Sequence, residues 1–398
     1  MLTLDKIYHA SFTLKKYIRP TDLIHAPKIC PDSEIYLKTE NLQITGSFKV
    51  RGACYKISQL NEAERAKGVI ACSAGNHAQG VAMAAAINNI KALICLPDGA
   101  PISKVEATKS YGAEVCLVEG GYDEAYAKAI ELQAEMGYTF IHPFDDDDVI
   151  AGQGTIGLEI LESLPDIEAV IVRVGGSGLI AGIAYVIKSL KPEVKVYGVQ
   201  AAGAPSMKQS LKEKKVCCLS QANTIADGIA VKQPGEITFD LCSQYVDEIV
   251  TVTEDEISTA ILTLIEQQKL IAEGAGAVAV AAAMFGKLPI KGKKVVCLVS
   301  GGNIDVTILS RIIKRGLLTS GRICSLNIEL VDKPGQLKGV SRIIADCGGN
   351  VISIHHERSN EGSDINGCFL RIELETRNYE HILEIRKALM EGGFKLQD

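Results

Sequence analysis

The sequence predicts an α/β protein with two doubly wound parallel sheets in two lobes, followed by a smaller domain with a ferredoxin-like order of elements. Three observations support this prediction. Apolar runs of strand length alternate with longer helical patterns through most of the chain, and the composition shifts near residues 316–322. The 398 residues, 47% of them hydrophobic, are enough for two or three domains with sizeable cores.

The expected strands of the first part are short apolar segments, each followed by a turn or a helical pattern. Continuous apolar runs indicate strands buried on both faces, as in parallel sheets. An Ala- and Gly-rich run at residues 274–286 is too short to span a bilayer and predicts a buried helix. The strands are expected at residues 68–72, 91–96, 114–118, 169–172, 196–199 and 295–299. Helices are expected at 78–88 and 122–136, and a further helix is expected to follow Pro97 and to end at 109. We expect a first domain at residues 1–318, with a smaller lobe at about 50–145.

The second domain is expected at residues 319–398. Alternating apolar and polar residues predict a half-exposed strand at 323–331, and the order that follows is helix, strand, strand, helix and a short final strand. This order, βαββαβ, is that of a ferredoxin-like split βαβ fold. The first helix is expected to end at 347, the next two strands lie at 351–355 and 368–375, and the second helix lies at 379–391.

The charge, the N-terminal segment and the cysteines of the sequence argue against several classes of protein, among them nucleic-acid-binding, secreted and membrane proteins. The net charge is −6 and no basic block is present, so nucleic acid is not an expected partner. The N-terminus lacks the pattern of a signal peptide, and no segment predicts a membrane span. The 12 cysteines are scattered without a CxxC pair, which favours reduced thiols in a cytoplasmic protein and predicts no metal site.

One lysine stands at the start of an expected helix. Lys49 follows a polar, glycine-bearing turn in the segment Thr45–Gly52 and lies beside Arg51 in sequence. A helix N-terminus and a neighbouring cation disfavour the ammonium form, so we expect its pKa to fall. A neutral amine forms a Schiff base with an aldehyde cofactor. The alternative interpretation is a solvated surface lysine.

Three more segments occupy the turns where expected strands end. They are residues 73–77, the glycine loop 175–179 and residues 300–303. Backbone N–H groups of a glycine loop at a helix N-terminus can bind a phosphate, although such glycines also occur for steric reasons. The alternatives are a helix cap for Asn76, a packing role for His77, a backbone contact for Ser300 and a helix-start carboxylate for Glu273.

With Glu40-Asn41-Leu42-Gln43, these segments resemble in order and spacing the threonine/serine dehydratases, over roughly residues 10–318. Those are pyridoxal 5′-phosphate (PLP) enzymes of the tryptophan-synthase-β-like fold, fold type II. The resemblance implies that Lys49 holds PLP and abstracts the α-proton, that Asn76 holds the cofactor's 3′-oxygen, and that Ser300 faces its ring nitrogen. The implied cofactor-binding residues are Lys49, Phe48, Asn76, Gly175, Gly176, Ser177, Gly178, Leu179 and Ser300; the implied substrate-binding residues are Ser73, Ala74, Gly75, Asn76 and His77, with Glu273 in support.

Among the positions that depart from related sequences, three bear on the expected chemistry. Arg173 stands where the family usually has proline, and Ser177 replaces a glycine, where its hydroxyl could reach the phosphate or crowd it. Ala74 stands where serine racemases of this fold carry a serine. Because alanine cannot donate a proton, this position favours elimination over racemisation.

The resemblance implies β-elimination of L-threonine to 2-oxobutanoate and ammonia, which is threonine ammonia-lyase activity, and of L-serine to pyruvate. The alternatives are a serine racemase, another β-eliminating or β-replacing enzyme of the fold, and a catalytically inactive amino-acid sensor. The turn Asp332–Leu337 resembles that of an ACT domain, which implies regulation by an amino acid or a nucleotide. We expect a homodimer or homotetramer, and the alternative for this domain is assembly alone. The resemblance is consistent with a biosynthetic role and with a catabolic role.

Overall fold

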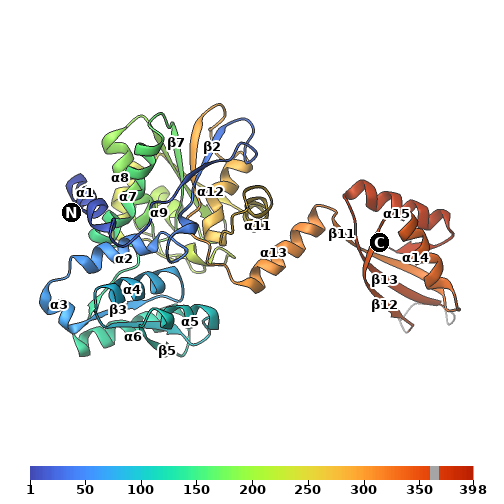
Figure 1. Cartoon of the computed structure of the whole chain (residues 1–398), viewed down its shortest axis with the longest axis horizontal. Coiled ribbons are helices and arrows are strands. Elements are labelled where there is room, and N and C mark those ends of the chain that lie inside the picture. Colours follow the sequence, from blue (N-terminus) through green and yellow to red (C-terminus); the bar gives the residue numbers. More distant parts are fainter. Residues whose placement is uncertain (359–366, 398) are drawn as a thin grey trace. The chain divides into compact units, whose positions relative to one another are not determined.

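The computed structural model describes residues 1–358 and 367–397 (Figure 1). The chain divides into two compact units, Met1–Asp305 and Val306–Asp398. Helix α13 (Val306–Thr319) belongs to the second unit, whereas the boundary expected at 318/319 left it in the first domain. In the described part of the chain, no helix is long and apolar enough to cross a membrane.

The larger sheet of the first unit has six strands in the order β1-β2-β10-β7-β8-β9. All neighbours are parallel except β1, which pairs antiparallel with β2 at one edge. Every residue of β7 is buried, which explains the apolar run of its first four residues, 169–172. The strands are β1 (Leu23–His25), β2 (Glu34–Lys38), β7 (Ala169–Arg173), β8 (Lys195–Ala201), β9 (Glu248–Val252) and β10 (Lys294–Leu298).

The smaller sheet has four parallel strands in the order β5-β4-β3-β6. Strand β3 is buried throughout, but β5 is only partly buried because it lies at the sheet edge. The expectation of burial on both faces is therefore wrong for β5. The strands are β3 (Val69–Cys72), β4 (Ala92–Pro97), β5 (Glu114–Val118) and β6 (Thr139–Phe140).

Helices connect the strands, and several begin directly at a strand end. Helix α12 is buried from Gly274 to Ala283, as the Ala- and Gly-rich run predicts. Helices α2 and α7 approach closely, because a Cβ at Gly152 would lie 2.7 Å from the Cα of Gly52. The helices are α1 (Leu4–Leu14), α2 (Lys49–Ser58), α3 (Glu62–Lys67), α4 (Asn76–Ile87), α5 (Ile102–Ser110), α6 (Tyr122–Met136), α7 (Asp147–Ser163), α8 (Gly178–Leu190), α9 (Ser206–Glu213), α10 (Glu236–Tyr245), α11 (Glu254–Thr263) and α12 (Gly274–Met284), with short turns η1 (Glu40–Leu42), η2 (Asp227–Ile229) and η3 (Leu264–Gln268).

The second unit has an antiparallel sheet in the order β12-β13-β11-β14. Its apolar residues alternate along β11 and β13 and pack with α14 and α15 into one core. The expected order βαββαβ is confirmed. The elements are β11 (Ile323–Val331), α14 (Gln336–Asp346), β12 (Asn350–Glu357), β13 (Gly367–Glu375), α15 (Tyr379–Glu391) and β14 (Lys395–Gln397).

Candidate active site

Lys49 is the first residue of α2, directly after the buried Phe48. Its Nζ donates a hydrogen bond to the backbone carbonyl of Pro143. Burial, and next the positive charge of Arg173, lower the pKa of Lys49 to about 7, although Glu273 acts in the opposite direction. The predicted fall is confirmed. The amine is therefore substantially neutral near pH 7, as a Schiff-base lysine requires.

Arg51 does not lower that pKa, so this part of the sequence interpretation is wrong. Its buried guanidinium lies 2.7 Å from an oxygen of Glu40 and also pairs with Glu159. Lys38 contacts the same Glu159 at 2.7 Å. Two carboxylates thus compensate the Arg51 charge, and the network ties the first turns of α2 to η1 and α7.

Asn76 begins α4 and contacts a residue nearly two hundred positions away. Its Nδ2 donates to both carboxylate oxygens of Glu273, at 2.8 and 2.9 Å. Its Oδ1 accepts from Nδ2 of Asn303 at 2.7 Å, and that nitrogen also donates to the carbonyl of Thr45 at 2.7 Å. Burial raises the pKa of Glu273, while the charge of Arg173 opposes the rise. A Cβ at Gly301 would lie 2.6 Å from Glu273, so glycine permits this arrangement.

The predicted substrate loop borders open space at Gly75. Ser73, Ala74, Gly75 and Asn76 are half-buried, and a Cβ at Gly75 would meet no atom within 4 Å. His77 is different, because it is buried and its Nε2 pairs with the carbonyl of Ile141 at 2.8 Å. Burial, and next the charge of Lys49, lower the pKa of His77 to about 3. A neutral, backbone-bonded imidazole fits a packing role.

The glycine loop combines close packing with a helix start. A Cβ at Gly176 would lie 2.1 Å from the ring of Phe144, and one at Gly178 would lie 2.6 Å from the carbonyl oxygen of Phe144. Gly178 opens α8, whose first-turn N–H groups, including that of Leu179, have no intrahelical acceptors. The loop that begins at Gly175 therefore requires glycine for steric reasons, and it also precedes a helix start with unpaired N–H groups.

Ser177 adopts a backbone conformation that favours glycine. Its φ is +76° at the N-cap of α8, in the left-handed region. Its Oγ donates to the carbonyl of Gly175 at 3.1 Å, so the hydroxyl already has an acceptor within the loop.

Ser300 follows β10 and is buried. Its Oγ donates to the carbonyl of Ala275 at 3.3 Å, in the first turn of α12, and not to its own following glycines. Its carbonyl accepts from the N–H of Phe48 at 3.1 Å. Ser300 is thereby joined to the residue that precedes Lys49.

Sequence reasoning assigned no role to Arg173 or Asn303. The Arg173 guanidinium lies 4.7 Å from the ring centroid of Phe48 and donates to the carbonyl of Gly228 at 2.8 Å. Only 5% of Arg173 is exposed. The signal that pointed to it was its departure from the family's proline. Asn303 lay within a recognised motif, but its contact with Asn76 depends on the fold.

These groups match the chemistry of PLP. Lys49 offers an amine of lowered pKa for the aldehyde, and Asn76 offers an amide for the phenolic oxygen. The first turn of α8 offers N–H groups for the phosphate. Ser300 offers a neutral hydroxyl for the ring nitrogen. The donor set therefore fits the cofactor, and all of its residues belong to the first unit, which contains the two parallel sheets.

Comparison with known proteins gives the family. Residues 14–301 match the family "pyridoxal-phosphate dependent enzyme", and residues 325–389 match the ACT domain. The chain is 50% identical to an L-threonine ammonia-lyase of Thermotoga maritima, covering 100% of this chain and 99% of that protein. The chain belongs to the family of pyridoxal-phosphate dependent enzymes, and it carries a C-terminal ACT domain.

Two solved structures resemble the chain in fold. Threonine deaminase isoform 2 of Solanum lycopersicum has a TM-score of 0.74 and 39% identity, over 79% of this chain and 90% of that one. The T.th. threonine deaminase has a TM-score of 0.72 and 38% identity, over 76% of this chain and 99% of that one. The T.th. structure therefore matches this chain over nearly its whole length, but it leaves about a quarter of this chain unmatched.

Proposed function

We propose that this protein is an L-threonine ammonia-lyase that converts L-threonine to 2-oxobutanoate and ammonia and also accepts L-serine, giving pyruvate. The observation that carries the proposal is the 50% identity, over the whole chain, to a protein of that name. Lys49, Asn76, the loop at 175–179 and Ser300 are all retained and converge in the first unit, which argues against an inactive sensor.

In the proposed mechanism, bound PLP supplies an aldehyde for the substrate amine and a conjugated ring that withdraws electrons from the α-carbon. Lys49 acts as the base that accepts the α-proton, because its pKa of about 7 keeps much of the amine neutral. The N–H groups at the start of α4, in the loop 73–77, hold the substrate carboxylate. Asn76 would hold the cofactor's 3′-oxygen through its amide, and the hydrogen bond that Asn303 donates to the Asn76 Oδ1 fixes the direction of that amide.

Ala74 supports elimination over racemisation. Racemisation requires a proton donor on the face of the substrate opposite Lys49. The methyl group of Ala74, half-buried in the loop before α4, cannot supply that proton.

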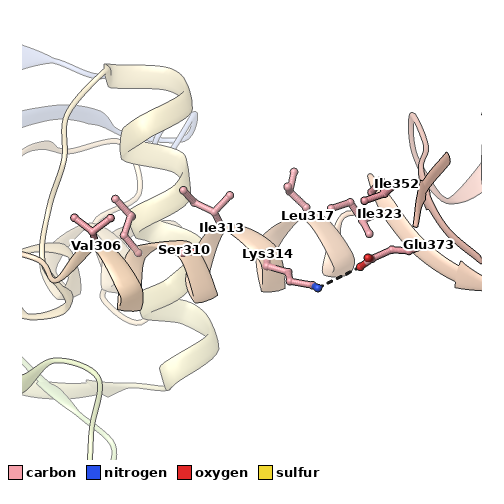
Figure 2. A pocket seen from close by; sticks show the side chains of 9 residues that line it. Val306, Ser310, Ile313, Lys314, Leu317, Ile323, Ile352 and Glu373 are labelled. Carbon is pink, nitrogen blue, oxygen red and sulfur yellow. Dashed lines mark ion pairs between the residues drawn. The ribbon is translucent and has the colours of Figure 1, made fainter. Parts of the chain in front are cut away.

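We further propose regulation through the second unit and assembly as a homodimer or homotetramer. Residues 1–318 carry the reaction in this proposal, and residues 319–398 bind an amino acid or nucleotide effector. A groove of about 400 Å³ in the second unit, drawn in Figure 2, is lined by apolar side chains of α13 and by Ile323 and Ile352 of the sheet. Such apolar surface supports contact between subunits. Twelve free cysteines support a cytoplasmic location.

The test is an assay of the full-length protein with PLP and L-threonine, with L-serine in parallel. We expect 2-oxobutanoate and ammonia in equal amounts, and complete loss of both in Lys49→Ala. Lys56→Ala is the matched control, because Lys56 lies in the same helix but pairs with Asp146 at 2.7 Å. Failure to form an oxo acid from either substrate would refute the proposal, and D-serine as the main product from L-serine would favour a racemase.

A further inference from the structure

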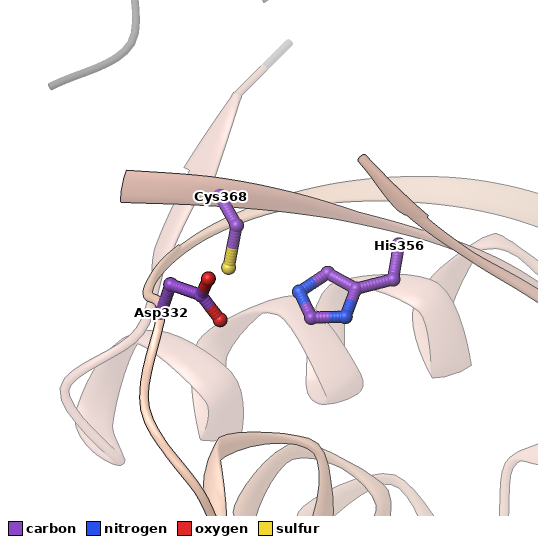
Figure 3. A group of neighbouring side chains, drawn as sticks. All are labelled: Asp332, His356 and Cys368. Atoms are coloured by element: carbon purple, nitrogen blue, oxygen red, sulfur yellow. The ribbon is translucent and has the colours of Figure 1, made fainter. Parts of the chain in front are cut away.

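Three side chains of different chemical type meet at one end of the second unit's sheet (Figure 3). Asp332 follows the end of β11, His356 lies on β12 and Cys368 lies on β13. These strands are adjacent in the order β12-β13-β11. One ligand atom from each residue lies within 4.8 Å of the other two. The carboxylate, the imidazole and the thiol therefore surround a common point.

The pairing of the strands explains why the three side chains meet. Cys368 pairs with Leu330, and His356 pairs with Leu370 two residues further along β13. Opposite residues of an antiparallel pair, and residues two apart on one strand, share a face of the sheet. His356 and Cys368 thus lie on the face that packs against the helices, and the chain leaving β11 brings Asp332 to the same end.

A carboxylate, an imidazole and a thiolate are all ligands of divalent zinc, which binds them at about 2.0–2.3 Å. Atoms bound to one tetrahedral ion at these distances lie about 3.3–3.8 Å apart. The ligand atoms lie at most 4.8 Å apart, so they need to approach one another by no more than about 1.5 Å. The exposed Asp332 and His356 can make this shift by rotation about their side-chain bonds. Cys368 is 1% exposed and is already fixed by its packing.

One side of the site faces a cavity, and the side chain of Arg358 competes with a metal ion for the Asp332 carboxylate. A cavity of about 260 Å³ is lined by the three residues and by the turn from Lys333 to Leu337. Arg358 lies with its Nε 3.1 Å from the Asp332 carboxylate. Three protein ligands with a free fourth position describe a metal site that remains accessible to water or a small molecule.

We propose that Asp332, His356 and Cys368 bind one divalent transition-metal ion of the zinc type, with the fourth position open to this cavity. The ion takes the Asp332 carboxylate from Arg358, and the Cys368 thiol releases its proton to solvent on binding. The spacing of these residues in the sequence does not indicate the site, because Asp332 follows β11 whereas His356 and Cys368 lie on two other strands.

The test uses the full-length protein with PLP, first treated with a chelator, and then titrated with Co²⁺ and with Zn²⁺. Cobalt bound to a thiolate gives an intense near-ultraviolet charge-transfer band, and Zn²⁺ affinity follows from calorimetry and from displacement of Co²⁺. We expect one ion per chain. His356→Gln and Cys368→Ser should each weaken binding by more than about 100-fold, because loss of an outer-shell partner alone costs about 10- to 100-fold.

The matched controls are His355→Gln and Cys347→Ser, which change the same residue types in the same domain outside the cluster and should leave affinity unchanged. His356 is exposed, so its variant keeps the test decisive even if Cys368→Ser fails to fold. Arg358→Gln should bind the ion more tightly, because it frees the Asp332 carboxylate. Absence of the charge-transfer band, or a band that His356→Gln leaves unchanged, would overturn the proposal.

Discussion

The amide of Asn76 donates to both carboxylate oxygens of Glu273, at 2.8 and 2.9 Å. Because Asn303 donates to the Asn76 Oδ1 at 2.7 Å, the two ends of the amide are distinguished. The donor end faces a buried carboxylate whose pKa is raised by its burial. The residue proposed to hold the cofactor's 3′-oxygen is thus oriented by a partner that is itself anchored to Thr45.

Asn303→Ala should weaken PLP binding without removing Lys49 or Asn76. The substitution deletes the donor that orients the Asn76 amide, and a loss of about 1–2 kcal/mol corresponds to about 5- to 30-fold in affinity. Absorbance titration of cofactor-free protein with PLP measures the effect. Asn223→Ala, which changes an exposed asparagine, is the control. Equal affinities in the two variants would contradict an orienting role for Asn303.

Cofactor uptake should depend on pH with a midpoint near 7. The amine of Lys49 reacts with an aldehyde only when neutral, and burial together with Arg173 lowers its pKa to about 7. The neutral fraction grows as pH rises through the pKa, so the uptake rate should increase across this range and then level off. Stopped-flow absorbance after mixing cofactor-free protein with PLP provides the measurement.

Lys56 supplies the internal control for that experiment. Burial acts to lower the pKa of Lys56, but the hydrogen bonds and charges of Asp146 and Asp148 outweigh burial and raise this pKa. Lys56→Met should therefore leave the uptake profile unchanged, while Lys49→Met should abolish the lysine-dependent absorbance. A rate that continues to climb to pH 10 would show that Lys49 keeps an ordinary lysine pKa.

Removing the charge of Arg173 should move the uptake midpoint to higher pH. The Arg173 guanidinium disfavours the Lys49 ammonium, so Arg173→Gln should raise the pKa of Lys49. Arg173→Lys keeps a positive charge and serves as the matched variant, for which we expect a smaller shift. The same stopped-flow series decides, and an unchanged midpoint in Arg173→Gln would leave burial as the whole cause.

Ser177→Gly should be more stable than Ser177→Ala by about 1–2 kcal/mol. Both changes remove the hydroxyl, but only glycine adopts the φ of +76° without steric cost. Urea unfolding of the two variants gives the difference. At Ser243, inside α10, the order should reverse, because glycine is about 1 kcal/mol worse than alanine within a helix. If the glycine variant were the more stable one at both positions, or the alanine variant at both, the result would contradict backbone strain at Ser177.

The sequence predicted those features that depend on local pattern. Apolar runs predicted β3, β4, β7, β8 and β10, and the alternation in β11 predicted the antiparallel sheet of the second unit. Strands β1, β2, β6 and β9 were not anticipated. The edge position of β5 also could not be foreseen, because strand order in a sheet is set by contacts between distant segments.

In the candidate site, too, local features were predictable from the sequence, whereas contacts between distant residues were not. The lowered pKa of Lys49 was predicted, but its cause was assigned to Arg51, a neighbour in the sequence. The cation that lowers this pKa is Arg173, at the end of strand β7. The pairing of Arg51 with Glu40 and Glu159 depends on tertiary structure. Asp332, His356 and Cys368 likewise meet only through strand pairing.

A chain that ends at Asp305 should keep its catalytic properties and lose its response to effectors. The first compact unit ends there, and every proposed PLP contact lies before Ile304. The similarity to the T.th. threonine deaminase covers 99% of that protein but 76% of this chain, so a comparable fold exists at the shorter length. We therefore expect the truncated chain to bind PLP with its normal spectrum and to turn over L-threonine.

Loss of the effector response follows because allostery needs a second site whose occupancy favours one of two states. In this protein the proposed second site lies in the ACT domain, within residues 325–389. Steady-state kinetics of both chains across amino acids, including isoleucine and valine, and nucleotides provide the measurement. We expect an effector to change the substrate concentration at half-maximal rate in the full-length protein and to leave it constant in the truncated one. An equal response in both chains would place regulation within residues 1–305 and leave the ACT domain a role in assembly alone.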